Sequence, residues 1–215
     1  MKKQNKTFYT AIIFLLLFVV WTILLKFIDL KPIGPNNSVV GFATINGYFH
    51  KVTGVNMTLY TITDWLGLVP IFICLLFSCI GVFQLIKRKS ILKVDYNILT
   101  LGVFYILVIL VYILFEKVVI NYRPVLINGY LEVSYPSSTT LLCMCVMPTA
   151  VRVFKKLIKN KIFSRCITIA IIIFTAFMVI ARLISGVHWL SDIIGGILLS
   201  AGLVTLYYSV NKFKF

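Results

Sequence analysis

Acidic residues and histidines are scarce in this chain. Its 215 residues include six Asp and Glu and two His, against 21 Lys and Arg. Carboxylates are the usual ligands of hard metal ions, so the sequence implies no metal site, and it implies no cofactor. The five cysteines all fall within apolar stretches, with the spacing of neither a disulfide framework nor a zinc site. They are Cys74, Cys79, Cys143, Cys145 and Cys166, and we interpret them as small apolar packing residues.

The sequence also lacks internal repeats, so it gives no support to an inverted-repeat transporter. What it has is hydrophobic length: 60% of the residues are hydrophobic. Six apolar runs are each about the 20 residues that a membrane-spanning helix requires. This pattern predicts an all-α, polytopic membrane bundle of six transmembrane helices. The predicted spans are 7–28, 65–86, 97–117, 137–154, 166–184 and 190–210.

The first apolar run follows Lys2, Lys3 and Lys6 and has the polarity of a signal peptide. It is longer than the apolar core of a signal peptide, and LKFIDLKPIG after it offers no small-residue cleavage site. We therefore predict a retained span. Residues 1–64 would form this helix and a long outer loop with turns and a short interfacial helix, and residues 65–215 would form a core of five spans.

The net charge of +15 is unevenly distributed along the chain. If alternate loops face opposite sides, 15 basic residues fall on one side and six on the other, which matches the positive-inside rule. We predict that both termini are cytoplasmic and that the charge is an orientation signal at the lipid bilayer, with no nucleic-acid partner. The inner set is Lys2, Lys3, Lys6, Lys87, Arg88, Lys89, Lys93, Arg152, Lys155, Lys156, Lys159, Lys161, Arg165, Lys212 and Lys214; the outer set is Lys26, Lys31, Lys51, Lys117, Arg123 and Arg182.

The run ARLISGVHWLSD, residues 181–192, joins the last two apolar stretches. Charge near a bilayer core is costly, so Arg182, His188 and Asp192 are functional candidates. Four residues separate His188 from Asp192, so the carboxylate could fix one imidazole tautomer and leave the other nitrogen as a nucleophile. Arg182 could bind an oxyanion. The alternative is that these side chains only extend to water at the interface.

Two more polar clusters fall on the same outer side: EKVVINYRP at 116–124 and SYPSSTT at 134–140. With Arg182, Lys117 and Arg123 would form an anion site. A helix starting after Pro136 would add backbone N–H donors suited to phosphate. Taken singly, the basic residues are ordinary interfacial side chains and the Ser/Thr run is an ordinary helix cap. The prediction rests on their coincidence on one side, and the residues in the helix start are Ser137, Ser138 and Thr139.

These clusters resemble the signature of the type 2 phosphatidic acid phosphatase superfamily, membrane lipid phosphatases related in their core to vanadium haloperoxidases. The residues that match in order are Arg123, Pro124, Pro136, Ser137, Arg182, His188 and Asp192. The resemblance covers roughly residues 65–210 and implies a six-helix membrane bundle. It further implies that His188 attacks phosphorus to give a phosphohistidine and that Asp192 orients His188. Arg123 and Arg182 would hold the phosphoryl oxygens.

The chain departs from the family pattern at several positions. Glu116 stands where the family has its Lys, and Lys117 lies one residue later, a rotation of about 100° on a helix. Ser138 replaces a Gly, and Ala181 replaces a Ser. Thr139 replaces the histidine that protonates the leaving group in the family. General acid catalysis is worth about 10²–10⁴-fold, and a threonine cannot supply it.

Three interpretations of this substitution remain open. The substrate could have a leaving group that needs little protonation, such as the phosphate monoester expelled from a polyprenyl diphosphate. Another outer group could act as the acid, the candidates being His50, Glu116 and Glu132. The chain could also bind lipid phosphates without turnover.

The sequence therefore predicts a metal-independent lipid phosphatase of the plasma membrane, with its site on the extracytoplasmic face. A polyprenyl diphosphate is the favoured substrate, and a lipid phosphotransferase is an alternative. A small channel or transporter is disfavoured because the basic residues lie at span ends. The sequence makes no prediction of oligomeric state.

Overall fold

The computed structural model describes residues 2–211, with side chains from residue 6 onward. In this part the chain is all-helical apart from isolated β-bridges. The elements, in chain order, are α1 Lys2–Phe27, η1 Pro35–Asn37, α2 Ala43–Thr53, α3 Met57–Leu66, α4 Leu68–Arg88, η2 Ile91–Lys93, α5 Tyr96–Lys117, α6 Ser138–Leu157, α7 Lys161–Ile184 and α8 Leu190–Val210.

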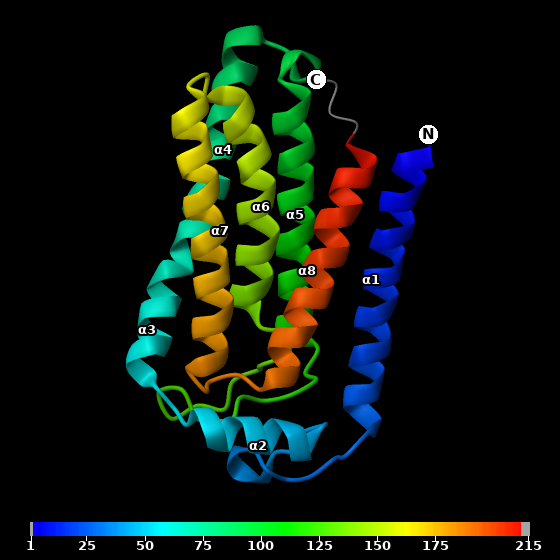
Figure 1. Cartoon of the computed structure of the whole chain (residues 1–215), viewed down its shortest axis with the longest axis vertical. Coiled ribbons are helices and arrows are strands. Elements are labelled where there is room, and N and C mark those ends of the chain that lie inside the picture. Colours follow the sequence, from blue (N-terminus) through cyan, green and yellow to red (C-terminus); the bar gives the residue numbers. More distant parts are fainter. Residues whose placement is uncertain (1, 212–215) are drawn as a thin grey trace.

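Five segments of the described chain are long and apolar enough to cross a membrane. They are Lys6–Phe27, Met57–Arg88, Tyr96–Lys117, Lys161–Ile184 and Leu190–Val210. Of the six predicted spans, α6 falls outside this set. It packs against α4, α5, α7 and α8, in the middle of the bundle (Figure 1). A helix enclosed by other helices meets little lipid, so it tolerates buried polar residues such as Thr140 and Thr149. The count of six spans stays a prediction.

The helix α1 packs along α8, far from it in sequence (Figure 1). The Trp21 indole donates a hydrogen bond to the Ser191 carbonyl at 3.1 Å. Close approach depends on Gly202, where an added Cβ would lie 2.7 Å from Leu15 Cδ2. The first helix is therefore an integral part of the bundle in this structure.

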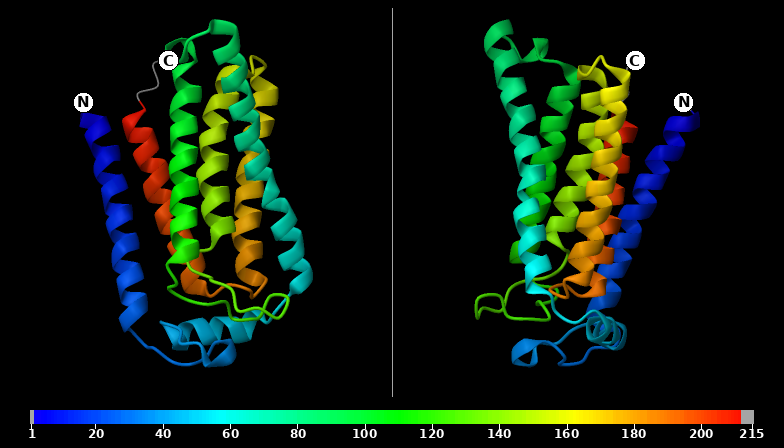
Figure 2. Two further views of the ribbon diagram at one scale, coloured as in Figure 1. Left: turned by 180° about the vertical axis from the view of Figure 1, so that it is seen from behind. Right: turned by 60° about the vertical axis from the view of Figure 1, so that its left-hand side comes forward.

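The two ends of the bundle differ in their number of basic residues and in the loops and short helices that form them. The start of α1, the end of α8 and the loops that join α4 to α5 and α6 to α7 lie at one end (Figure 2). The basic loop residues assigned to the inner set lie here, although Lys212 and Lys214 fall outside the described residues. The α2 helix, the loop between α5 and α6, and the turn between α7 and α8 lie at the opposite end, which we call the cap end. Which side of the membrane each end faces stays a prediction.

The long outer loop forms two helices, α2 and α3, where the sequence predicted one short helix. The α2 helix lies across the cap end (Figure 1) and is fixed to the start of α8 by Asn46. The Asn46 side-chain amide donates to Ser191 Oγ at 2.9 Å and its oxygen accepts from the Ser191 amide at 3.1 Å. The α3 helix leads into α4 through Gly67, and the two helices together make the candidate span Met57–Arg88, which begins eight residues before the predicted span 65–86.

Two glycines of α8 bring it close to its neighbours. A Cβ at Gly195 would lie 2.5 Å from the Tyr135 ring, and a Cβ at Gly196 would lie 3.2 Å from Thr140. These contacts hold the start of α6 and the loop residue Tyr135 against α8, because small residues let helices approach closely. The phenol of Tyr135 also makes a 2.6 Å hydrogen bond with Thr22 of α1.

Candidate active site

The loop between α5 and α6 folds back on itself and presents two polar side chains to one point. Isolated bridges pair Tyr122 with Val133 and Ile127 with Tyr130. The Arg123 amide donates to the Glu132 carbonyl at 3.0 Å. This pairing brings Arg123 beside Ser134, so both side chains reach His188 of the α7–α8 turn.

Ser134 lies between His188 and Asp192. Its hydroxyl donates to Asp192 Oδ2 at 2.5 Å and is 3.0 Å from His188 Nδ1. The direct distance from His188 Nδ1 to Asp192 Oδ2 is 3.9 Å, longer than a hydrogen bond. The carboxylate also accepts from the Trp189 amide at 2.9 Å, at the start of α8. Asp192 therefore acts on His188 through the Ser134 hydroxyl.

The surrounding donors determine which imidazole nitrogen carries the proton. Arg123 Nη1 lies 3.2 Å from His188 Nε2, and a guanidinium has donors only, so Nε2 must accept. The Ser134 hydroxyl gives its own proton to Asp192, so its oxygen accepts from the Nδ1–H of His188. The neutral imidazole thus carries its proton on Nδ1, and its lone pair is on Nε2, beside a guanidinium.

His188 is fully enclosed and lies near two positive charges. Burial, followed by the charges of Arg123 and Arg182, lowers the pKa of His188 well below its usual range. The ring is therefore neutral at neutral pH, the form in which a histidine acts as a nucleophile.

Arg182 is buried and is held by α3. Its guanidinium donates to Thr63 Oγ1 at 3.2 Å and lies 3.5 Å from Asp64 Oδ1. It stacks over the Tyr60 ring, 4.7 Å from the ring centroid, and Arg123 lies 5.8 Å from the same centroid. Tyr60 therefore sits against both arginines. Both guanidiniums lie near enough to His188 for their charges to act on it, and two guanidiniums at one site can bind a tetrahedral oxyanion.

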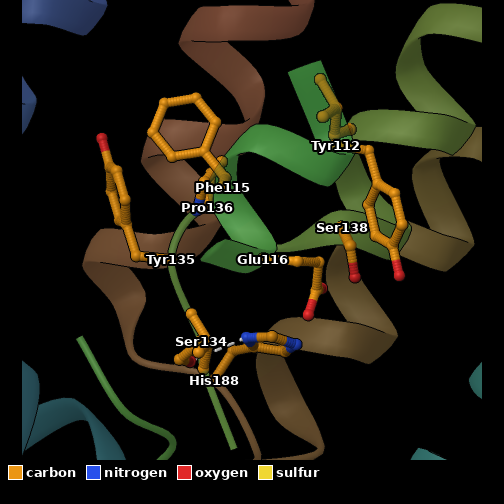
Figure 3. A pocket seen from close by; sticks show the side chains of 10 residues that line it. Tyr112, Phe115, Glu116, Ser134, Tyr135, Pro136, Ser138 and His188 are labelled. Carbon is orange, nitrogen blue, oxygen red and sulfur yellow. Dashed lines mark hydrogen bonds between the residues drawn. The ribbon is translucent and has the colours of Figure 1, made fainter. Parts of the chain in front are cut away.

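A cleft opens beside His188 between α5 and α6 (Figure 3). Its polar lining includes Glu116, Ser138 and Tyr112, and its apolar walls include Phe115 and Leu141. Figure 3 shows the Glu116 carboxylate directed toward the His188 ring. The neutral imidazole, the two guanidiniums near it and the cleft with polar and apolar walls together form a candidate site for an anionic group.

Comparison with known proteins agrees with this geometry. The family model of the PAP2 superfamily matches residues 8–215. The chain belongs to the PAP2 superfamily. A solved structure with the same fold is the transmembrane PAP2-type phosphatidylglycerolphosphate phosphatase from Bacillus subtilis, with a TM-score of 0.56 and 19% sequence identity. The match covers 96% of this chain and all of that one. No curated protein sequence matches the chain significantly.

The PAP2 motif residues predicted from the sequence fall into two groups in the structure. Arg123, Arg182, His188 and Asp192 are buried around one point. Lys117 ends α5 and is exposed, and Thr139 lies against Gly67, 3.6 Å from the position of an added Cβ there. The first group forms the candidate site, and no hydrogen bond or ion pair joins Lys117 to it among the described residues.

The predicted serines at the start of α6 have different surroundings. Ser137 is fully buried, its amide donates to the Asp192 carbonyl at 3.1 Å, and its hydroxyl accepts from Thr140 at 3.1 Å. Ser138 lines the cleft. Ser137 therefore joins α6 to α8, and Ser138 is the one of the pair that is open to a ligand.

Several site residues of this PAP2 protein were missed by sequence reasoning. Ser134 and Asn121 lie inside the two polar clusters that the sequence singles out, but nothing in their spacing marks them. Asn121 donates to Asp192 at 3.4 Å. Tyr60, which contacts both arginines, lies in α3 and carries no sequence signal at all. The α3 helix supplies this residue and the partners of Arg182. The predicted boundary between 1–64 and 65–215 falls inside this helix.

The three residues predicted as candidate acids have different surroundings in the structure. The Glu132 carboxylate pairs with Arg123 Nε at 3.0 Å. The His50 ring packs on Trp189, 5.5 Å between centroids, and burial lowers the pKa of His50. Glu116 is the candidate that shares a cleft with His188. Within the described residues, no group of three or more His, Cys, Asp and Glu side chains is placed to hold a metal ion.

Proposed function

We propose that this protein is an integral membrane phosphatase that hydrolyses a lipid phosphate or diphosphate through a phosphohistidine on His188. The observation that carries the proposal is the bonding of His188: Nδ1–H toward the Ser134–Asp192 pair, and a lone pair on Nε2 beside Arg123. A neutral, oriented imidazole beside a phosphate-binding guanidinium is an activated nucleophile.

In the first step, the Nε2 lone pair forms a bond to phosphorus and the bond from phosphorus to the leaving oxygen breaks with its electron pair. Arg123 moves from Nε2 to the phosphoryl oxygens, and Arg182 binds them from the Tyr60 side. These cations stabilise the charge of the transition state, so the proposal requires no metal. The positive imidazole ring is stabilised through Ser134 by Asp192. In the second step, water attacks phosphorus and releases inorganic phosphate.

The remaining predicted contacts belong to the same proposal. Ser138 and the start of α6, with Ser137 and Thr139, would offer donors to the phosphate, and Lys117 would reach the headgroup from the rim. The cleft walls Phe115 and Leu141 would meet the first part of the lipid tail, which stays in the bilayer. The site would face the extracytoplasmic side of the plasma membrane, as the charge bias of the loops indicates.

Thr139 supports a polyprenyl diphosphate as the substrate, because its leaving group is a phosphate monoester that departs without prior protonation. The B. subtilis phosphatase is named for phosphatidylglycerolphosphate, a monoester whose leaving group is an alcohol. That substrate is the second candidate. A lipid phosphotransferase and a binding protein without turnover are the alternatives that the assay must separate.

The test is phosphate release by the purified protein in detergent without added metal, comparing a polyprenyl diphosphate with phosphatidylglycerolphosphate. His188→Ala should lower turnover by about 10⁴-fold or more, as expected for loss of a nucleophile. His50→Gln is the matched control for loss of a histidine and should retain most of the activity.

The outcomes are distinct. Faster release from the diphosphate supports the substrate assignment, and equal or faster release from the monoester overturns it while keeping the enzyme. Phosphate recovered on a second lipid identifies a phosphotransferase. Binding of both lipids by a wild-type protein that releases no phosphate overturns the proposed activity.

A further inference from the structure

We infer that Glu116 is a further catalytic residue, which takes the proton of the water that hydrolyses the phosphohistidine. The inference rests on the proposed function. It assigns to Glu116 the role of proton acceptor in the second step, from the placement of Glu116 in the cleft beside His188.

The geometry supports this role. Glu116 occupies the last turn of α5, and its carboxylate is directed toward the His188 ring, with Ser138 also lining the cleft (Figure 3). Tyr112 lies one turn earlier on the same face and interacts with Glu116. Water entering the cleft from this side would reach a phosphoryl group on His188 between Glu116 and Ser138.

The other five carboxylates are committed elsewhere. Asp192 is bound by Ser134 and Trp189, Glu132 pairs with Arg123, and Asp64 pairs with Arg182. Asp29 pairs with Lys31, and Asp95 pairs with Arg88 at the end of α4. Glu116 lines the cleft and is in no salt bridge among the described residues, so it is the carboxylate placed to accept a proton there.

The chemistry is balanced at each atom. The water oxygen forms a bond to phosphorus while the bond from phosphorus to Nε2 breaks, and its electron pair returns to the imidazole. One water proton passes to the Glu116 carboxylate, and the other stays on the phosphate that is released. Glu116 then gives its proton to bulk water, which restores the carboxylate for the next cycle. A carboxylate repels phosphate oxygens, so phosphate binding alone does not explain an acidic residue at this position.

The test separates the two chemical steps in a rapid-quench experiment on the full-length protein, with polyprenyl diphosphate labelled on its terminal phosphate. Glu116→Gln keeps the shape of the side chain but cannot take a proton. It should release the first equivalent of lipid monophosphate about as fast as wild type, and then turn over about 10²–10⁴-fold more slowly. Acid-labile, alkali-stable label should accumulate on the protein, close to one per site.

Two further variants sharpen the result. Glu116→Asp keeps the proton acceptor and should recover part of the steady-state rate. Glu132→Gln removes a carboxylate of the same cap end and should change KM through its partner Arg123 without accumulating label. Thermal melting of each variant in detergent checks that it is folded.

Turnover of Glu116→Gln close to wild type would overturn the inference. An equal fall of the first turnover and the steady state in Glu116→Gln, without label on the protein, would also overturn it, because Glu116 would then act before the phosphohistidine forms. A wild-type protein that never becomes labelled and releases no phosphate would instead overturn the proposed function, and with it the inference.

Discussion

At the residue scale, the Ser134 hydroxyl connects Asp192 to His188 through two hydrogen bonds. The sequence singles out His188 and Asp192 by their four-residue spacing, and the structure places His188 Nδ1 3.9 Å from Asp192 Oδ2. The direct bond that the spacing suggests is replaced by a hydroxyl from 54 residues earlier in the chain. Spacing along one helix carries no information about a side chain that arrives from another loop, so Ser134 could not be predicted.

We expect Ser134→Ala to lower kcat by about 10–100-fold with little change in KM. The variant leaves Nδ1–H and Asp192 without their shared partner, and hydrogen bonds to charged groups are worth about 1.5–3 kcal/mol. Steady-state kinetics on the preferred lipid would measure this. Ser200→Ala is the control, because Ser200 is a buried serine of α8 that does not line the cleft. Equal kinetics for the two variants would remove Ser134 from the mechanism.

The lowered pKa of His188 predicts a pH dependence of stability. In the unfolded chain His188 titrates near its usual value of about 6.5. In the folded protein its pKa is lower, so the unfolded state binds the extra proton first and the folded state loses stability as pH falls below about 6.5. The melting temperature of wild type minus that of His188→Asn should therefore decrease from pH 8 to pH 5. A difference that stays constant would contradict a buried, neutral His188.

At the element scale, most predicted helix ends lie within three residues of the observed ones, but α1 and α7 begin five residues before the predicted starts of 7–28 and 166–184. For α5 and α8 the predicted spans 97–117 and 190–210 differ from the observed helices by at most one residue. The α3 helix was missed because its ten residues are too few to form a span and lie in a stretch rich in Thr and Gly. Its role, holding Arg182, depends on tertiary contacts that the sequence does not reveal.

The contact between α8 and the start of α6 predicts that Gly195→Ala destabilises the protein by about 1–3 kcal/mol. The added methyl would lie 2.5 Å from the buried Tyr135 ring, and overpacking of this kind has that magnitude. Gly102→Ala in α5 is the matched control, because nothing lies within 4 Å of its added Cβ. It should leave stability unchanged or raise it by about 0.5–1 kcal/mol. Thermal melting in detergent compares the two, and equal effects would argue against the close packing.

At the scale of the whole molecule, the basic loops and the candidate site lie at opposite ends of the helical bundle. The basic loops gather at the end away from His188, and the cap end carries few cations beyond those of the site (Figure 2). The sequence predicts this division because loop charge is a local property. It does not predict that residues 57–66 complete the site, because that depends on how the outer loop folds over the core.

This division predicts the orientation of the protein in the cell membrane. In a background with the five cysteines replaced, Tyr130→Cys at the cap end should react with a membrane-impermeant maleimide on intact cells. Leu92→Cys, an exposed position between α4 and α5, should react only after the cells are permeabilised. The opposite pattern would place the site in the cytoplasm and contradict the positive-inside assignment.

The packing of α1 on α8 has a consequence for the order in which the protein matures. The ribosome makes α1 first and α8 last among the helices. The α1 helix therefore has no packing partner in α8 until almost the whole chain has been inserted. His188 and Asp192 arrive with the same late segment, and Trp21 and Asn46 fix its start through Ser191. His188 and the residues that hold α1 against α8 are therefore made together, and a nascent chain that ends before residue 188 has neither.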